Sequence, residues 1–212
     1  MINNELKDNN KEEQNKRIIK LNLYYQHLKL IKYFIENKIY SYKIVETNNY
    51  YSYTLEQRMK IINATTTKVM CKTIILENKN YDKLQESKYY KRYYMCIVQY
   101  TSEFNAEKIA KLLKSRQNTF CKDNQLSNKY FHFRLSKEEI AFNMSGYMFN
   151  CITPFLMKCK DMEIILPNSL INIYPYYFWL GGGDIELKVG ISVQDFYKLY
   201  EKQIIIGDVL GK

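Results

Sequence analysis

The sequence predicts an α+β fold built on a mixed β-sheet, and three observations lead to this prediction. Segments with strand character outnumber segments with helical spacing. Strands and helices do not alternate strictly along the chain, as they would in a doubly wound parallel sheet. Hydrophobic residues make up 46% of the 212 residues and charged residues 25%, which is ordinary for a chain that buries a core.

The first 39 residues are expected to lie outside the main domain. Residues 1–15 are polar and predict a disordered lead-in, and residues 16–39 predict an amphipathic helix. Its apolar residues recur at helical spacing, at Ile18, Leu21, Tyr25, Leu28, Ile31 and Ile35. This stripe is expected to pack on the domain of residues 40–212, and the alternative is that the helix docks a partner.

Seven segments have strand character, because β-branched and apolar residues either alternate or run continuously in them. They are 41–47, 68–76, 92–100, 131–135, 162–166, 176–180 and 185–191. Gly181, Gly182, Gly183 and Asp184 predict a turn between the last two. The polar stretch 117–129 predicts a surface loop.

Capping patterns predict the helices that lie between these strands. Two Ser/Thr-x-x-Glu/Gln boxes, Thr54 with Gln57 and Ser136 with Glu139, each open a helix. The second of these helices is expected to end near Gly146. Asn105 is expected to cap a helix whose Ile109 and Leu112 face inward, and Ser192 with Asp195 begins the final helix.

Charge and cysteine content restrict the partners and the compartment. The chain has 32 Lys and Arg against 22 Asp and Glu, a net charge of +10, which suits an anionic partner such as a nucleic acid. A lysine-rich surface encoded by an A+T-rich genome explains the charge equally well. Five cysteines without metal-ligand spacing predict free thiols in a reducing compartment. No secretory leader or membrane span is evident, so we expect a cytoplasmic protein and no membrane partner.

The usual catalytic motifs are missing from the sequence. It has two histidines, His27 and His132, and each is expected to be structural. No GxSxG, HExxH or Walker motif occurs, and the three consecutive glycines lack the context of a dinucleotide fingerprint. Classical triads, zinc enzymes and P-loop enzymes are therefore unsupported, and we expect no cofactor and no metal.

Three segments remain unusual. Lys72 is the only charge in the strand VMCKTIIL and shares a face with Met70, Ile74 and Leu76, so it marks either an anion-binding pocket or a protected strand edge. Residues 145–155 form an irregular loop that can aim amides at a ligand or simply connect two elements. Residues 181–184 allow close backbone approach, or make a plain hairpin turn.

Taken in order, these segments resemble the YbaK / prolyl-tRNA-synthetase-associated editing domain family from about residue 40 onward. The strand Cys71-Lys72-Thr73-Ile74-Ile75 matches the family's Lys-Thr strand, and Gly146-Tyr147 leads into Asn150-Cys151-Ile152-Thr153-Pro154 as in the family's loop. Asn168-Ser169 matches the Asn-Ser pair that follows a strand in the family. The last match to the family extends without an insertion or deletion from Gly181-Gly182-Gly183 through Gln194-Asp195-Phe196. The resemblance implies a largely antiparallel, barrel-like sheet flanked by helices.

The resemblance also implies an aminoacyl-tRNA deacylase that clears alanine or cysteine from proline tRNA. Its partners would be the acceptor end of aminoacyl-tRNA and prolyl-tRNA synthetase. The implied catalytic residues are Lys72, Gly146, Asn150, Thr153 and Pro154. The implied substrate-binding residues are Thr73, Tyr147, Cys151, Ile152, Asn168, Ser169, Gly182, Gly183 and Asp184. Positioning of an activated ester, rather than a protein nucleophile, would supply the rate.

One position departs from the family pattern. Asn150 stands where the family has glycine, and asparagine is the residue that best tolerates a positive φ in place of glycine. The loop backbone is therefore expected to persist. The sequence leaves two other functions open: a catalytically weak module that binds tRNA or a synthetase, and a small-molecule or nucleotide binder without tRNA specificity.

Overall fold

The structure, a computed structural model, describes residues 2–211, with side chains from residue 13 onward. The α-helices are α1 (Ile2–Glu36), α2 (Leu55–Ile61), α3 (Ala106–Phe120), α4 (Glu138–Ser145), α5 (Asn168–Ile171) and α6 (Val193–Tyr200). The strands are β1 (Tyr42–Glu46), β2 (Cys71–Asn78), β3 (Tyr93–Gln99), β4 (Phe133–Leu135), β5 (Ile164–Pro167), β6 (Tyr177–Gly181), β7 (Leu187–Ser192) and β8 (Ile204–Gly207). Short 3-10 helices lie at η1 (Tyr50–Ser52), η2 (Thr67–Val69), η3 (Lys83–Gln85) and η4 (Asn128–Tyr130).

The strands form two sheets, so the predicted α+β class with a mixed sheet is confirmed. A three-stranded antiparallel sheet has the order β1-β7-β6. A five-stranded sheet has the order β4-β2-β3-β5-β8, with antiparallel pairs at β2 and parallel pairs at β5. An isolated bridge between Met70 and Trp179 connects the two sheets. The described strands do not close into a barrel, which corrects the barrel-like sheet that the resemblance implied.

The five-stranded sheet is the middle layer, and each of its faces has its own core. Ile75, Met95 and Ile97 belong to a cluster that includes Phe178 and Val189 of the smaller sheet. The residues that alternate with them, including Leu76, Cys96 and Val98, pack with Ile109 and Leu113 of α3. Period-two alternation therefore sorts the strands into one face toward the second sheet and one toward α3.

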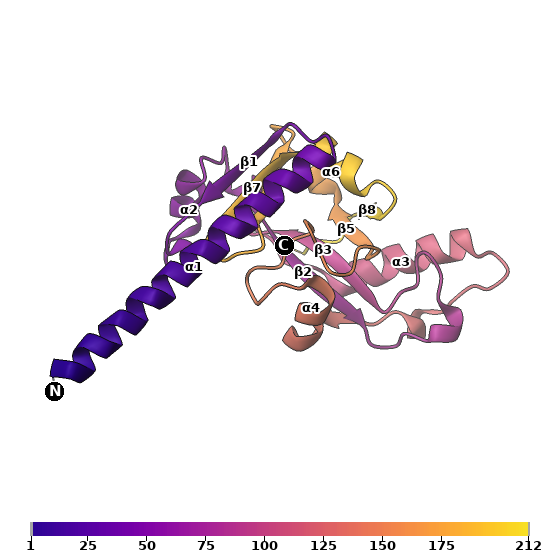
Figure 1. Cartoon of the computed structure of the whole chain (residues 1–212). Coiled ribbons are helices and arrows are strands. Elements are labelled where there is room, and N and C mark those ends of the chain that lie inside the picture. Colours follow the sequence, from indigo (N-terminus) through magenta and orange to yellow (C-terminus); the bar gives the residue numbers. More distant parts are fainter. Residues whose placement is uncertain (1, 212) are drawn as a thin grey trace.

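Helix α1 lies along the outside of the domain and extends well beyond it (Figure 1). It differs from the prediction in two ways. Residues 2–15 are helical rather than an irregular lead-in, consistent with the Lys, Glu and Gln they contain. The predicted apolar stripe is mostly exposed, whereas Leu30 and Phe34 on another face are fully buried. Burying such a side chain stabilises the fold by roughly 1.5–3 kcal/mol, so these two residues hold the helix in place.

Most predicted elements are present, and the corrections concern boundaries and caps. The capping box of α2 is formed by Thr54 and Gln57, as predicted. Helix α4 begins after Lys137, so Ser136 does not cap it; the Ser136 amide instead donates to Ile75 O. Strand β8 was not predicted. Its short apolar run, Ile204–Gly207, follows α6 closely and looks like a continuation of the apolar residues of that helix.

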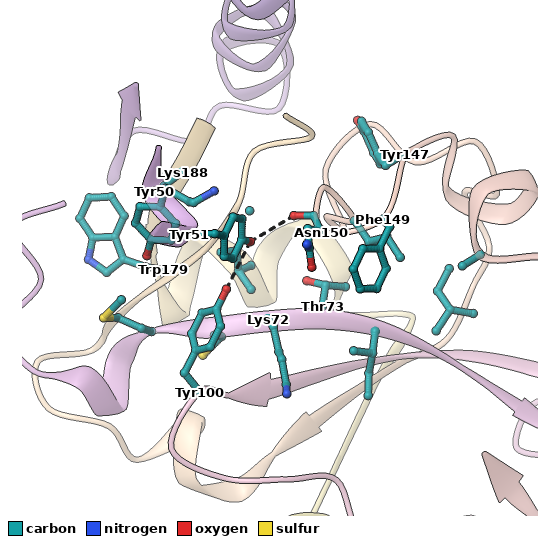
Figure 2. A pocket seen from close by; sticks show the side chains of 18 of the residues that line it. Tyr50, Tyr51, Lys72, Thr73, Tyr100, Tyr147, Phe149, Asn150, Trp179 and Lys188 are labelled. Atoms are coloured by element: carbon teal, nitrogen blue, oxygen red, sulfur yellow. Dashed lines mark hydrogen bonds between the residues drawn. The ribbon is translucent and has the colours of Figure 1, made fainter. Parts of the chain in front are cut away.

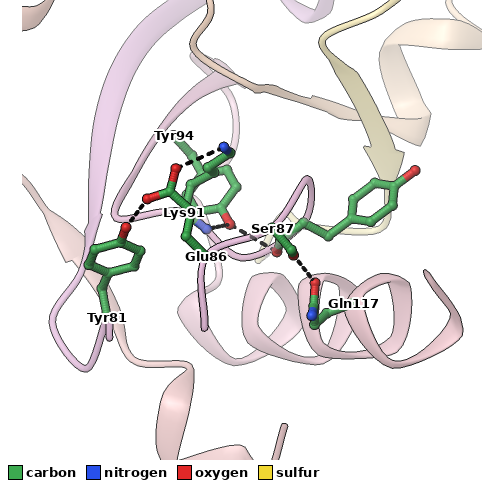
Figure 3. Close-up of polar contacts among 7 residues, drawn as sticks. Tyr81, Glu86, Ser87, Lys91, Tyr94 and Gln117 are labelled. Carbon is green, nitrogen blue, oxygen red and sulfur yellow. Dashed lines mark hydrogen bonds and ion pairs between the residues drawn. The ribbon is translucent and has the colours of Figure 1, made fainter. Parts of the chain in front are cut away.

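The polar stretch predicted as a loop is in part helix α3, and Figure 3 shows why. Gln117 is buried and accepts a hydrogen bond from Ser87 in the segment between β2 and β3. Nearby, Lys91 pairs with Glu86 at 3.0 Å, and Tyr81 donates to the same carboxylate. A polar residue is thus buried because a partner from a distant segment satisfies it, which local pattern cannot reveal.

In the part of the chain from residue 2 to 211, no helix combines the length and apolar character needed to cross a membrane.

Candidate functional site

A cavity of about 410 Å³ lies beside β2, between the five-stranded sheet and the loop after α4 (Figure 2). Its size falls in the range of small-molecule pockets. Its lining comes from β2, from η1 and α4, from residues 147–152 and from β6 and β7. The residues used below are Tyr50, Tyr51, Lys72, Thr73, Tyr100, Tyr147, Asn150, Ile152, Trp179 and Lys188.

An open edge of β2 forms the floor of the cavity. Strand β2 is bridged to β6 at Met70 and pairs with β4 only from Leu76 onward. Met70 O accepts from the amide of Tyr100, which follows β3, whereas Ile75 O accepts from Ser136 N on the opposite side. Since backbone direction alternates along an antiparallel strand, the backbone groups of Thr73 point to the open edge. Unpaired main-chain groups are therefore available to a ligand there.

The Thr73 side chain is the polar group on this floor. It is 7% exposed, and its Oγ1 has no hydrogen-bond partner among the described residues. In Figure 2 it points toward Asn150 across the cavity. A buried hydroxyl without a partner costs roughly 1–3 kcal/mol, so an orphan aimed into a cavity is a position where a ligand can supply the missing bond.

The loop after α4 forms the mouth of the cavity. Gly146 ends the helix in the left-handed region with φ 80, as predicted. Asn150 has φ 64, in the left-handed region that asparagine tolerates better than other non-glycine residues. The Tyr51 hydroxyl donates to Asn150 O at 3.2 Å and thereby ties the loop to the opposite wall.

Aromatic residues build the wall that faces this loop. Tyr50 and Tyr51 come from η1, Tyr100 follows β3, and Trp179 lies on β6. The hydroxyls of Tyr51 and Tyr100 lie 3.4 Å apart, and burial raises the pKa of both phenols. These phenols stay neutral at physiological pH, so the wall offers ring faces and hydroxyl groups rather than negative charge.

Lys188 on β7, which was not predicted as a site residue, lies in the same wall. It is 4% exposed, and its Nζ is 4.3 Å from the centre of the Tyr50 ring and 5.0 Å from that of Tyr51. Its Nζ donates a hydrogen bond to Ile185 O at 2.6 Å. Burial lowers the pKa of the ammonium to about 8, against the opposing effects of Glu186, Cys151 and Asp184. A signal was available: Lys188 is a lone charge in the apolar run LKVGI, as Lys72 is in the run VMCKTIIL.

Lys72 occupies a different place. It is exposed, and in Figure 2 its amine points away from Thr73 and Asn150. Alternation along β2 puts Lys72 on the face that carries Ile74 and Leu76, opposite the face of Thr73. Lys72 therefore lies at the rim of the cavity, with its charge in solvent.

A groove of about 680 Å³ runs between α1 and the turn after β6. Gln26 of α1 donates to Gly182 O at 3.0 Å and approaches the Tyr147 hydroxyl at 3.4 Å. Gly183 has φ 88, and a Cβ there would lie 2.4 Å from the Gln26 amide. The glycine thus permits the close contact by which α1 is fixed against the turn. Lys29, Lys32 and Lys158 also line this groove.

The structure brings together some of the fourteen predicted site residues. Those that line the cavity are Lys72, Thr73, Tyr147, Asn150 and Ile152. Those that line the groove are Gly146, Tyr147, Gly183 and Asp184. Those that line neither are Cys151, Thr153, Pro154, Asn168, Ser169 and Gly182.

Several residues of that last group have structural partners. Thr153 is fully buried, and Pro154 O accepts from the Tyr200 hydroxyl at 2.8 Å. Ser169 donates to Gln99 Oε1 at 2.5 Å. These contacts hold the loop and α5 against the core, so the residues shape the site from behind.

Comparison with known proteins gives structural neighbours only. No family model and no curated protein matches the sequence. An epitope scaffold made by computational backbone grafting has a TM-score of 0.64 at 11% identity, over 88% of this chain and 97% of that one. A provisionally assigned trans-editing enzyme for prolyl-tRNA synthetase has a TM-score of 0.64 at 12% identity, over 88% and 98%. The fold is shared.

A third neighbour, a hypothetical protein, has a TM-score of 0.61 at 10% identity and covers 86% of this chain and 99% of its own. Identities this low establish a common fold and leave activity to be argued from the site. The likeness in fold to the provisionally assigned trans-editing enzyme agrees with the fold that the resemblance implied.

Proposed function

We propose that this chain belongs to the YbaK / prolyl-tRNA-synthetase-associated editing family and hydrolyses the ester of a mischarged aminoacyl-tRNA. The observation that carries the proposal is the orphan Thr73 hydroxyl, which faces a positive-φ loop across a cavity at an open strand edge. That arrangement offers hydrogen bonds to an ester while leaving room for water. The likeness in fold to a provisionally assigned prolyl-tRNA synthetase trans-editing enzyme adds support.

Substrate positioning is the mechanism that these groups can perform. The Thr73 hydroxyl and the open-edge amides of β2 hold the ester, and the loop at Asn150 closes over the aminoacyl group. The terminal adenine stacks on the tyrosine faces, a contact worth roughly 1–3 kcal/mol per base. Lys72 at the rim contacts a phosphate of the acceptor end. Water adds to the carbonyl carbon, the ester bond breaks, and the ribose oxygen leaves with a proton from that water.

The predicted substrate is alanine or cysteine on proline tRNA, delivered in partnership with prolyl-tRNA synthetase. Size selection in such a pocket gives only about 1–3 kcal/mol per methylene, so amino acids of similar size must be compared side by side. The first experiment measures deacylation of tRNAs charged with alanine, cysteine, serine and proline. Turnover of one mischarged species with sparing of the cognate proline ester is expected.

Thr73 variants provide the matched pair for this experiment. Thr73→Val removes the hydroxyl at constant shape, whereas Thr73→Ser keeps it. We expect Thr73→Val to lower turnover at least tenfold without loss of thermal stability, because the hydroxyl has no protein partner to lose. Equal turnover by both variants, or no turnover of any charged tRNA by the wild type, would refute the proposed function.

The groove beside α1 favours a second candidate, a module that binds tRNA or a synthetase without hydrolysis. Lys29, Lys32 and Lys158 line it, and the helix that supplies two of them extends past the domain. Steeply salt-dependent tRNA binding without turnover would favour this module. Weak salt dependence together with binding of free nucleotides would favour a small-molecule binder instead.

A further inference from the structure

Lys188 is a buried cation without an anionic partner. Among side chains 13–211, no carboxylate forms an ion pair with it, and its ammonium donates a hydrogen bond to the carbonyl of Ile185. An ammonium has three donors, so this bond leaves donor capacity for a ligand. Enclosing such a charge is costly unless something compensates it, and Lys188 is one of the residues that line the cavity.

The carboxylates of Glu186 and Asp184 act on Lys188 from a distance, against the lowering of its pKa by burial, but they hydrogen-bond to other groups. Glu186 accepts from Thr47 and from the Tyr50 amide, and Asp184 accepts from the Glu186 amide. Both acids are thus engaged elsewhere. The Tyr50 and Tyr51 rings stabilise the ammonium through their faces.

Arg58 and Cys151 complete the set of titratable groups around Lys188. The Arg58 guanidinium contacts the same two tyrosine rings, at 5.5 and 5.0 Å from their centres. Burial raises the pKa of the Cys151 thiol to about 11, so it stays neutral at physiological pH. The charges of Lys188 and Arg58 balance those of Glu186 and Asp184, and of these four groups Lys188 is the one that lines the cavity. It therefore suits a group that becomes negative inside the cavity.

We propose that Lys188 is a catalytic residue of this site: its ammonium donates a hydrogen bond to the ester carbonyl oxygen and stabilises the negative charge that this oxygen gains. The inference rests on the proposed function. Water forms the new C–O bond, the carbonyl electron pair moves onto the oxygen held by Lys188, and its return expels the ribose oxygen. The water proton ends on that leaving oxygen, and Lys188 keeps its own proton throughout.

This role differs from that of Lys72. The Lys72 amine points into solvent, where water screens it, whereas Lys188 acts within an aromatic wall of low polarity. A hydrogen-bond donor that is already held in position in such surroundings stabilises a transition state strongly, because it does not have to move during the reaction. The two lysines therefore act on different parts of one substrate.

The test compares Lys188→Met, Lys188→Arg and the control Lys198→Met. Lys198 also donates to a backbone carbonyl, Lys38 O at 2.9 Å, but it is exposed on α6. We expect Lys188→Met to lower kcat about 10²–10³-fold, the usual effect of removing one oxyanion donor. Its melting temperature should not fall, since methionine has nearly the same shape and removes a buried charge. Lys198→Met should change neither quantity.

Two further readouts separate catalysis from a structural role. Wild-type kcat/KM should fall as pH rises through about 8, where Lys188 loses its proton, and Lys188→Arg should remove this fall. A phosphonate analogue of alanyl-adenosine, which carries the tetrahedral anion, should bind Lys188→Met about 10²–10³-fold more weakly. An uncharged amide analogue should bind both proteins equally.

The outcomes distinguish this inference from the proposed function. If the wild type deacylates tRNA and Lys188→Met matches it, Lys188 is not catalytic although the function stands. A loss of activity that follows a loss of melting temperature would make Lys188 structural. A wild-type kcat/KM that rises as pH increases through 8 would show that the neutral Lys188 amine acts as a base instead. If the wild type neither turns over tRNA nor prefers the phosphonate, both proposals are wrong.

Discussion

The two lysines beside the cavity look alike in sequence and differ in the folded chain. Lys72 is the single charge in the apolar segment VMCKTIIL that leads into β2, and Lys188 is the single charge in β7. Strand β7 is central in its sheet, between β1 and β6, and Lys188 is packed against tyrosines. Strand β2 has an open edge at residues 71–75, and Lys72 reaches solvent.

The difference shows that the sheet, more than the strand, determines the role of a lone lysine. A strand's own residues reveal which side chains share a face. They do not reveal whether a neighbouring strand, an aromatic wall or water covers that face. An exposed lysine can offer long-range attraction to a phosphate, whereas an enclosed one can offer a fixed donor.

Kinetic separation of the two lysines is the largest expected effect. Lys72→Met should raise KM about tenfold, leave kcat within about twofold, and reduce the salt dependence of binding by about one unit of slope. Lys188→Met should instead lower kcat by 10²–10³-fold. Steady-state deacylation at two salt concentrations measures both. Equal losses of kcat in the two variants would mean that the lysines act on the same atoms.

The pH dependence of stability sharpens the comparison next. The folded pKa of Lys188 is about 8 against an ordinary 10.5, so between these values the unfolded chain holds one more proton. Wild-type stability should therefore rise relative to that of Lys188→Met as pH increases from 8 to 10.5, by up to about 3 kcal/mol. Denaturant unfolding across this range measures the difference. A constant difference would show that Lys188 is not enclosed as described.

Much of this molecule was predictable from the sequence, and the limits have physical causes. Alternation gave the strands and placed Lys72 with Ile74 and Leu76, and capping patterns predicted α2, α3 and α6. The positive φ at Asn150 also followed from its chemistry. Local pattern could not show that α1 packs through Leu30 and Phe34, because an apolar helix offers several faces.

The candidate site was predictable only where chain neighbours form it. The loop at Asn150 was identified from consecutive residues, and Thr73 from the resemblance of the strand around Lys72. Lys188, Tyr50 and Tyr51 come from segments far apart in the sequence, and only the packing of two sheets brings them together. Asn168 and Ser169 were assigned to the substrate by resemblance, yet Ser169 bonds to Gln99 and neither residue lines the cavity.

Glu163 gives the smallest expected effect and tests whether burial alone marks a functional group. Burial raises the pKa of its carboxyl to about 7, against the influence of Lys88 and Lys91, but it lines none of the cavities described here. Between pH 4.5 and 7, the folded chain therefore binds one more proton at Glu163 than the unfolded chain does. Wild-type stability falls as pH rises through this range.

Replacement of Glu163 isolates this effect from the titration of other groups. Relative to Glu163→Gln, the wild type should lose about 1–2 kcal/mol of stability over that range, with unchanged deacylation. Thermal unfolding at pH 4.5 and 7 checks the first statement and a kinetic assay the second. A change in turnover in Glu163→Gln would show that a buried group with a shifted pKa can affect activity even where it lines no cavity.

Trp179 gives the cavity its own optical probe. It is the single tryptophan of the sequence, it is 4% exposed, and it lies in the aromatic wall beside Lys188. Its indole emission therefore comes from one known place, and a nucleobase that stacks on this wall should quench it. Occupancy of the pocket can be followed in the unlabelled wild-type protein, at equilibrium or after rapid mixing. Emission from this one residue can thus time substrate arrival separately from ester cleavage.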